Sequence, residues 1–87
     1  MTAIIIYTTD PWHSIQSREI IAVASTEKNR DRIVRQFLSK GVYHKPSKEA
    51  IDIAIEELRQ MGQTQSLSES TDLEIDTEAY EVNSLQG

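Results

Sequence analysis

Apolar and polar positions in the first half of the chain follow the order strand, loop, strand, helix. The segments 3–9 and 19–25 are short runs rich in β-branched residues, which favour β-strands. Side chains alternate along a strand, so Ile4 and Ile6 share one face of the first run. The residues between and beside them are also apolar, and a strand that is apolar on both faces is predicted to lie in the middle of its sheet.

The second run leads into a predicted helix. Alternation places Ile21 and Val23 on one face of this strand and Ile20, Ala22 and Ala24 on the other. The pair Ser25-Thr26 has the chemistry of a helix N-cap, and Gly41 is expected to end the helix. The helix is expected to bury a stripe formed by Ile33, Val34, Phe37 and Leu38.

A second helix is predicted between Ser47, its expected N-cap, and Gly62, its expected stop. The polar segment 63–71 has no period and reads as a loop or mobile linker, and 72–83 reads as extended. A bulged strand is preferred there over a tight hairpin around Thr77-Glu78, which would lack a Gly or Asn turn residue. The second helix is expected to bury Ile51, Ala54, Ile55, Leu58 and Met61, with Ile53 on the flank of that stripe or exposed.

These elements predict an α+β fold of order ββααβ. We expect a three-stranded, mainly antiparallel sheet with two helices packed on one face, in a single domain over residues 1–83, and a frayed end at 84–87. The opposite sheet face, with Ile5, Tyr7 and Ile20, would then be uncovered and would be a surface for a partner or for self-association. The alternative is that the last segment or the loop after the first strand covers it.

Composition narrows the class of protein. The chain has 87 residues, no cysteine and no long apolar run, which points to one cytoplasmic domain without disulfides, thiolate zinc sites or membrane spans. Residues 1–50 carry eight Lys and Arg against five Asp and Glu, whereas 51–87 carry one against nine, within a net charge of −5. Such an acidic chain is not expected to bind duplex nucleic acid.

The connection 8–17 holds the most distinctive side chains. Asp10, His13, Ser14 and Ser17 resemble parts of a hydrolase site, but three such groups on one loop rarely converge with an oxyanion site, so capping and turn roles are expected. We therefore predict a protein that is not an enzyme, with no cofactor and no metal site, since His13 and His44 lack a ligand pattern. Trp12 is either packed at the edge of the core or an exposed anchor for a partner.

Two charged surfaces are also candidates for contacts. Lys28, Arg30, Arg32 and Arg35 give the first helix a mildly basic face, expected to be solvated or to meet an acidic partner. The C-terminal segment offers an acidic patch that either keeps the chain soluble or docks on a basic partner. Its residues are Asp72, Glu74, Asp76, Glu78 and Glu81.

The segment Ile21-Ala22-Val23-Ala24-Ser25-Thr26-Glu27-Lys28 resembles a strand-to-helix junction of small uncharacterised proteins of phages and bacterial mobile elements. The preceding segment 8–19, which includes Asp10-Pro11-Trp12-His13, is similar to a narrower group from gut bacteria and their phages. The resemblance covers about half the chain and implies an intracellular, phage-related setting, with no catalytic residues.

The leading hypothesis is a small non-enzymatic module that binds another protein. Its expected contact residues are Asp10, Trp12, His13, Tyr7, Ile5 and Ile20, and the phage resemblance makes an inhibitor of a host or defence protein a natural role. The alternatives are a homodimer through the same face, or a small-ligand or nucleotide-binding protein with a pocket under Thr8–Ser17, formed alone or across a dimer.

Overall fold

The central strand β1 (Thr2–Thr9) lies between β2 (Glu19–Ala24) and β3 (Glu74–Glu81) in an antiparallel sheet. The helices are α1 (Glu27–Lys40), α2 (Lys48–Met61) and the short α3 (Ser68–Thr71), and a 3-10 turn spans Ile15–Ser17. This computed structural model describes residues 2–40 and 45–81. The predicted α+β fold is confirmed, with α3 as an addition. The expected helix stop at Gly41 and the domain boundary at 83 lie outside the described residues.

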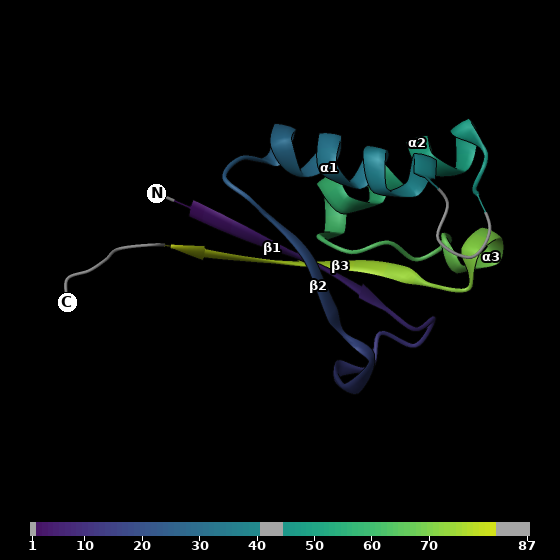
Figure 1. Ribbon diagram of the computed structural model, residues 1–87, viewed down its shortest axis with the longest axis horizontal. Helices are drawn as coiled ribbons and strands as arrows, with labels where there is room; N and C mark the ends of the chain where they lie inside the picture. The colour runs from purple at the N-terminus through teal and green to yellow at the C-terminus, as the bar shows by residue number, and fades with distance from the viewer. Residues whose placement is uncertain (1, 41–44, 82–87) are drawn as a thin grey trace.

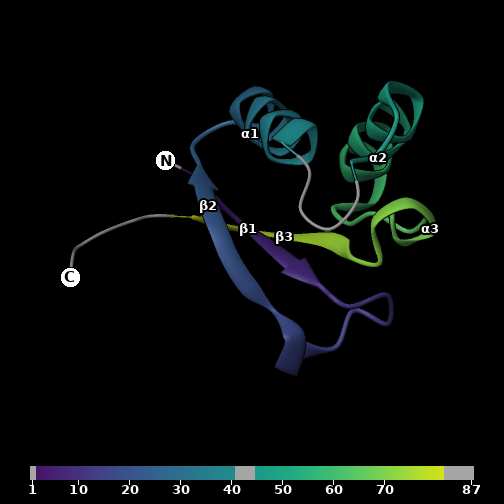
Figure 2. The same cartoon turned by 45° about the vertical axis from the view of Figure 1, so that its right-hand side comes forward.

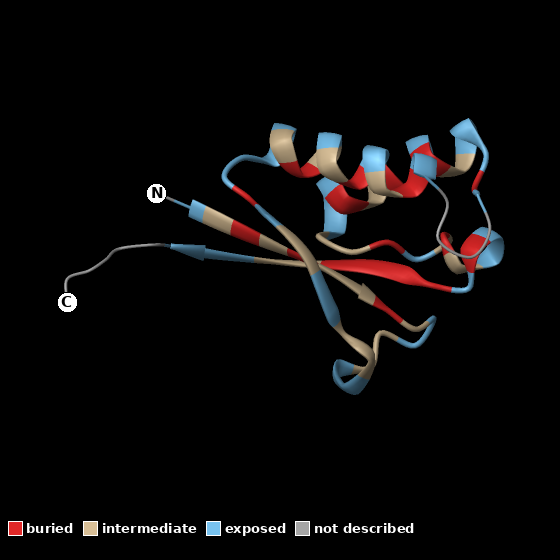
Figure 3. Cartoon of the chain, viewed as in Figure 1, coloured by how far each residue is buried: buried red, intermediate tan, exposed pale blue. Residues whose placement is uncertain are grey.

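Both long helices lie on the same side of the sheet, and the loop between β1 and β2 projects from the other side (Figure 1). Figure 2 shows α1 on the side of β2 and α2 displaced toward β3. The buried positions of the helices face the sheet (Figure 3). The loop between β1 and β2 is partly or fully exposed, and so is the C-terminal end of β3. Ile4 and Ile6 of β1 point into this core, as predicted, and are 6% and 0% exposed.

A β-bulge in β2 changes the predicted faces of that strand. Ile6 pairs with Ala22 but Tyr7 pairs with Ile20, so Ile21 is an extra residue in the ladder. Directly paired residues share a face, so Ile20 and Val23 both lie on the face away from the helices. The expectation that Ile21 and Val23 share a face is therefore wrong.

Helix α1 begins as predicted, because the Thr26 hydroxyl accepts a hydrogen bond from the Asn29 backbone N–H at 3.1 Å. Val34 and Leu38 are fully buried. Arg30 is also buried, at 5% exposure, and its guanidinium donates to Asp31. Arg30 is therefore not part of the predicted basic face, because it lies on the inner side of the helix.

Helix α2 is capped by the Ser47 hydroxyl, which accepts from the Ala50 N–H, and ends at Gly62, whose φ of 75° is left-handed. Both ends match the prediction. The exception is Met61, which was expected in the core but is 48% exposed, because the spacing of an α-helix places it at the edge of the buried stripe. Ile53 is exposed as well. The buried stripe consists of Ile51, Ala54, Ile55 and Leu58.

The polar segment 63–71 is packed and hydrogen-bonded. Residues 63–67 form a connection, as the loop prediction has it, but 68–71 form α3, and the packing contradicts a mobile linker. Thr64 is fully buried, and its N–H donates to the Ile75 carbonyl, which extends the sheet briefly beyond β3. Its hydroxyl donates to the buried Glu74 carboxylate and accepts from the Ile75 N–H. Buried Leu67 closes the same end of the core.

Strand β3 pairs with β1 without interruption from Thr2–Glu81 to Thr9–Glu74, so the hairpin alternative is wrong and no bulge is present in these pairs. Ile75 is fully buried on the face that packs against the helices, whereas Tyr80 lies on the opposite face. The apolar residues of β3 therefore change from one face to the other along a regular strand. The face away from the helices, here called the open face, comprises Ala3, Ile5, Tyr7, Ile20, Val23, Asp76, Glu78 and Tyr80.

Candidate functional site

The loop between β1 and β2 is built around the carboxylate of Asp10. This carboxylate accepts hydrogen bonds from the backbone N–H groups of Trp12 and Ser14, each at 3.0 Å, and from the Ser14 hydroxyl at 2.8 Å. The hydrogen bonds from Ser14 contribute most to lowering the pKa of Asp10, because they stabilise its charged form. Ser17 closes the loop by accepting from the Asp10 N–H and donating to the Ser14 carbonyl. The predicted turn roles of these residues are confirmed.

His13 ties the loop to the open face. Its backbone has a left-handed φ of 58°, which is uncommon for a side chain other than Gly, Asn or Asp. Its imidazole Nδ1 lies 2.6 Å from Oδ1 of Asp76, a residue 4% exposed on β3. A loop that is remote in sequence is thereby attached to the last strand.

Arg18 forms a second connection across the sheet. Its guanidinium lies 3.3 Å from Oδ2 of Asp76 and 3.0 Å from Oε2 of Glu78, and it stacks over the ring of Tyr7 with 4.6 Å to the ring centroid. Arg18 was not among the predicted site residues. Its position directly before β2 and across from two β3 carboxylates depends on the strand order, which a single sequence does not reveal.

Glu78 is the centre of this polar network. Its carboxylate accepts from the hydroxyl of Tyr80 at 2.6 Å and from that of Tyr7 at 3.0 Å, in addition to Arg18. These hydrogen bonds, led by that of Tyr80, lower the pKa of Glu78 to about 2. The same contact with Glu78 is the main cause that raises the pKa of Tyr80 to about 12. Near neutral pH the Glu78 carboxylate is therefore charged, while the Tyr80 hydroxyl keeps the proton that it donates to Glu78.

Large apolar side chains surround the polar network. Trp12 is 82% exposed at the tip of the loop, and Ile20 and Val23 are 63% and 58% exposed on β2. Ile5 is half-buried beside Val23, its partner in the sheet. The open face is thus uncovered along β2, at Ile20 and Val23, while His13 and Arg18 cover polar residues of β1 and β3. The sequence did not predict Val23 on the open face. The bulge that moves Val23 to this face depends on the register between two strands, which a single sequence does not show.

The predicted acidic patch is not a surface patch. Glu74 and Asp76 are buried, and Glu78 is held by Arg18 and the two tyrosines. Asp72 lies outside β3, as the left-handed C-cap of α3. Glu81 is exposed at the end of β3. A carboxylate cluster ready for a basic partner is therefore not formed by these five residues.

A cavity of about 260 Å³ lies under the loop, where the ligand-binding alternative places its pocket. It is smaller than most small-molecule sites. Asp10, Glu19 and Asp72 line it together with hydroxyl groups and Leu73, so its charge would repel a phosphate group. The cavity does not favour a nucleotide.

Within residues 2–40 and 45–81, no three His, Cys, Asp or Glu side chains form a group that could hold a metal ion. His44 lies outside these ranges. The Ser14 hydroxyl donates to Asp10 and that of Ser17 to a carbonyl, so both serve the loop.

Comparison with family models, with curated protein sequences and with solved structures finds nothing that matches this chain. Among the described residues, the helices are too short or too polar to cross a lipid bilayer.

Proposed function

We propose that this chain is a small binding module for another protein, with a contact surface formed by the Trp12 loop and the uncovered part of the open face. The observation that carries the proposal is the 82% exposure of Trp12 on a loop whose conformation is fixed by hydrogen bonds. Tryptophan is enriched among the residues that dominate binding energy at protein interfaces. Here it is the most exposed large hydrophobic residue among the described residues.

The fixed loop favours binding because little conformational entropy remains to be lost. Asp10 orients the backbone on both sides of the tryptophan, and His13 attaches the loop to Asp76. The backbone that carries the indole is therefore held in one conformation, and a pocket on a partner would bury an area on the order of 150–250 Å² of the indole.

Ile20 and Val23 extend the apolar surface from the loop along β2. The charged groups beside them are already paired, since Arg18 pairs with Asp76 and Glu78, and only its buried Nε has no hydrogen-bond partner among the described residues. A partner can therefore cover this face without leaving these charges unpaired. Burial of an unpaired charge is a common cause of weak binding.

The occupant that we propose is a different protein and not a second copy. Each copy carries a net charge of −5, so two copies repel one another as they approach. The resemblance to proteins of phages and mobile elements makes a host or defence protein of a gut bacterium the first class to search, and inhibition the first effect to measure.

The experiment compares three forms of the tagged chain in bacterial lysate: wild type, Trp12→Ala, and Ile53→Ala. Ile53 is a matched control because it is an exposed apolar side chain on α2, on the helical side of the molecule. We expect one stoichiometric partner with wild type and Ile53→Ala that is lost with Trp12→Ala, and a purified partner that binds at least tenfold more weakly to Trp12→Ala.

Circular dichroism and thermal melting establish that all three forms fold. Equal recovery of the partner with Trp12→Ala would reject the contact surface. Concentration-dependent dimerisation that is abolished by Trp12→Ala would replace the proposed partner by a second copy.

A further inference from the structure

We propose that the outer edge of β2 binds an extended segment of a partner by strand addition, and that this segment carries acidic side chains. The inference deepens the proposed function, because it rests on the chain binding another protein and names the chemistry of what is bound. It concerns a different surface from the Trp12 loop, namely the edge strand and the flank of α1 beside it.

The two edges of the sheet differ. The outer edge of β3 is partly occupied, because Thr64 N–H donates to the Ile75 carbonyl and Thr77 N–H donates to the Gly62 carbonyl. In the described part of the chain, β2 pairs only with β1, so its outer edge is open. An open edge presents backbone donors and acceptors that another strand can satisfy.

The features that usually protect an open edge are sparse in β2. From Ile20 to Ala24 the strand has no proline and no charged residue. The bulge at Ile21 is one protective feature, but the register with β1 is regular from Ala22 to Ala24. This regular portion is accessible to an added strand.

The hydrophobic core is also left open beside this edge. Ile21 on β2 and Ile33 and Phe37 on α1 pack against the core but are only partly buried. In Figure 2, α1 lies above the β2 side of the sheet, and the two elements are in contact. The three partly buried side chains therefore belong to the two elements that flank the open edge. A fourth strand next to β2 would shield part of this flank from water through its backbone and the methylene groups of the side chains that it directs toward α1.

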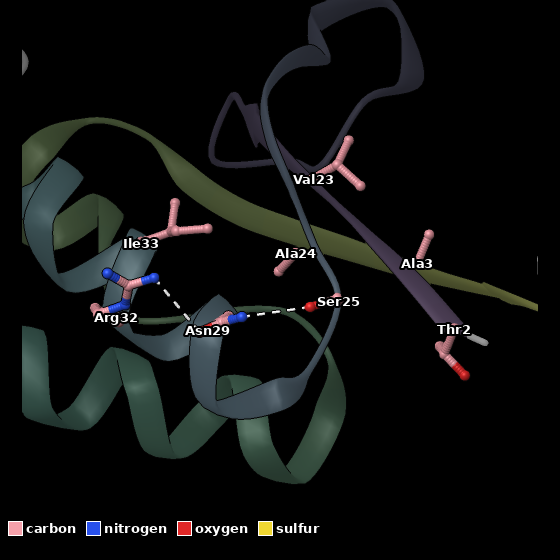
Figure 4. Close-up of a pocket in the computed structure, with 8 residues that line it drawn as sticks. All are labelled: Thr2, Ala3, Val23, Ala24, Ser25, Asn29, Arg32 and Ile33. Carbon is pink, nitrogen blue, oxygen red and sulfur yellow. Dashed lines mark hydrogen bonds between the residues drawn. The ribbon is translucent and has the colours of Figure 1, made fainter.

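A pocket of about 400 Å³ lies at the upper end of the edge, between β2, the start of β1 and α1 (Figure 4). One wall is polar: Arg32 donates to the Asn29 side-chain oxygen at 3.4 Å, and the Asn29 amide donates to the Ser25 hydroxyl at 3.3 Å. The first of these is long for a guanidinium, which is therefore weakly held.

The charge of this wall indicates the chemistry of the occupant. Arg32 forms no ion pair with any described carboxylate, whereas Arg35, on the side of α1 that faces α2, pairs with Asp52 at 2.9 Å. Lys40 adds a second cation further along α1, also without an ion pair among the described residues. A carboxylate on an added strand would satisfy Arg32 and form a charge-assisted hydrogen bond.

The same charges disfavour a second copy at this edge. Pairing two β2 strands about a two-fold axis would place both α1 helices on the same side of the joined sheet, each with Arg32 on the pocket wall beside the edge. Like charges would then face one another. A segment with alternating apolar and acidic residues avoids this repulsion and matches the apolar side chains of Ile20 and Val23 on the open face.

The probe is a synthetic peptide of sequence TVEVEVT with blocked ends. A peptide of sequence TVKVKVT tests the charge. Two further forms of TVEVEVT test strand pairing, because N-methylation removes the backbone N–H donors along one edge in the first form and along the other edge in the second. Binding to the full chain is measured by fluorescence anisotropy, and its location by amide chemical shifts and hydrogen exchange. We expect the acidic peptide to bind roughly tenfold more tightly than the lysine peptide. One of the two N-methylated peptides should lose binding, and exchange should slow at the amides of Ile20–Ala24.

Arg32→Gln should bring the ratio between the two peptides close to one, while the matched control Arg35→Gln, on the same helix but paired with Asp52, should leave it unchanged. Trp12→Ala should also leave peptide binding unchanged. This separates the two proposals: a lysate partner that depends on Trp12 but is indifferent to Arg32 supports the Trp12 surface and rejects the edge.

Three further results would overturn the inference. They are failure of the acidic peptide to bind, binding with equal loss for both N-methylated peptides, and slow exchange of the outward β2 amides in the peptide-free protein. The last result would mean that a second copy or another part of this chain already occupies the edge.

Discussion

Nδ1 of His13 and Oδ1 of Asp76 lie 2.6 Å apart although 63 positions separate the two residues. This contact joins the loop after the first strand to the last strand of the sheet. Because Asp76 is 4% exposed and also contacts Arg18, one buried carboxylate holds two groups that enter from the N-terminal half of the chain. The position of the Trp12 loop therefore depends on a residue that lies in a different strand.

Replacing Asp76 with asparagine should destabilise the fold by about 1–3 kcal/mol, because the ion pair with Arg18 and the charged partner of His13 are both removed. The measurement is the free energy of unfolding in urea. Asp72→Asn is the matched control, since Asp72 is exposed and its left-handed backbone accommodates asparagine. Similar stability of the two variants would show that the His13–Asp76 contact does not hold the loop in solution.

The ionisation of Glu78 should make stability depend on acid pH. The folded-state pKa of Glu78 is about 2, below its ordinary value of 4.5, so its charged form stabilises the fold above about pH 4.5. This contribution should be lost as the pH falls from 4.5 toward 2. The difference in urea midpoint between wild type and Glu78→Gln is therefore expected to be largest near pH 6 and to shrink below pH 4.

The control for Glu78 is Glu69→Gln, an exposed position on α3. Its difference from wild type should stay small across the same pH range. A difference for Glu78→Gln that does not change between pH 6 and pH 2.5 would mean that its hydrogen bonds with Tyr7 and Tyr80 do not depend on its charge.

Much of the fold could be predicted from local signals. The caps at Thr26 and Ser47, the stop at Gly62 and the central position of β1 depend on residues within a few positions of one another, so the sequence displays them directly. The bulge at Ile21 was missed because it is a property of the register between two strands.

The site was predictable in part for the same reason. Trp12 and the turn role of Asp10 follow from one short segment, and the structure places them as an exposed tip and its anchor. The network around Glu78 was missed because Arg18 lies 60 positions away and meets it only through the strand order β2-β1-β3. The five acidic residues seemed alike in sequence, yet Glu74 is buried and Asp72 is exposed.

Thr64→Val should test whether the segment after α2 is a packed part of the fold. The change keeps the volume of the side chain but removes the hydroxyl that donates to Glu74 and accepts from the Ile75 N–H. Two buried groups would be left without this partner, which should reduce the free energy of unfolding by about 1–3 kcal/mol. Exchange of the amides from 64 to 71 should also accelerate. Ser70→Ala, at an exposed position on α3, should be nearly neutral, and equal effects of both variants would favour an unpacked segment.

Gly62→Ala should destabilise the fold through its backbone and not through a clash. A Cβ atom at this position would lie 3.5 Å from the Thr77 hydroxyl, which is an ordinary contact, but the φ of 75° is unfavourable for alanine by about 1–2 kcal/mol. Asparagine tolerates this conformation better, so Gly62→Asn should lose about half as much or less. Thermal melting of both variants provides the measurement. A gain in stability for Gly62→Ala would indicate that the unfolded-state entropy of glycine outweighs the strain, and that α2 does not end in a left-handed residue in solution.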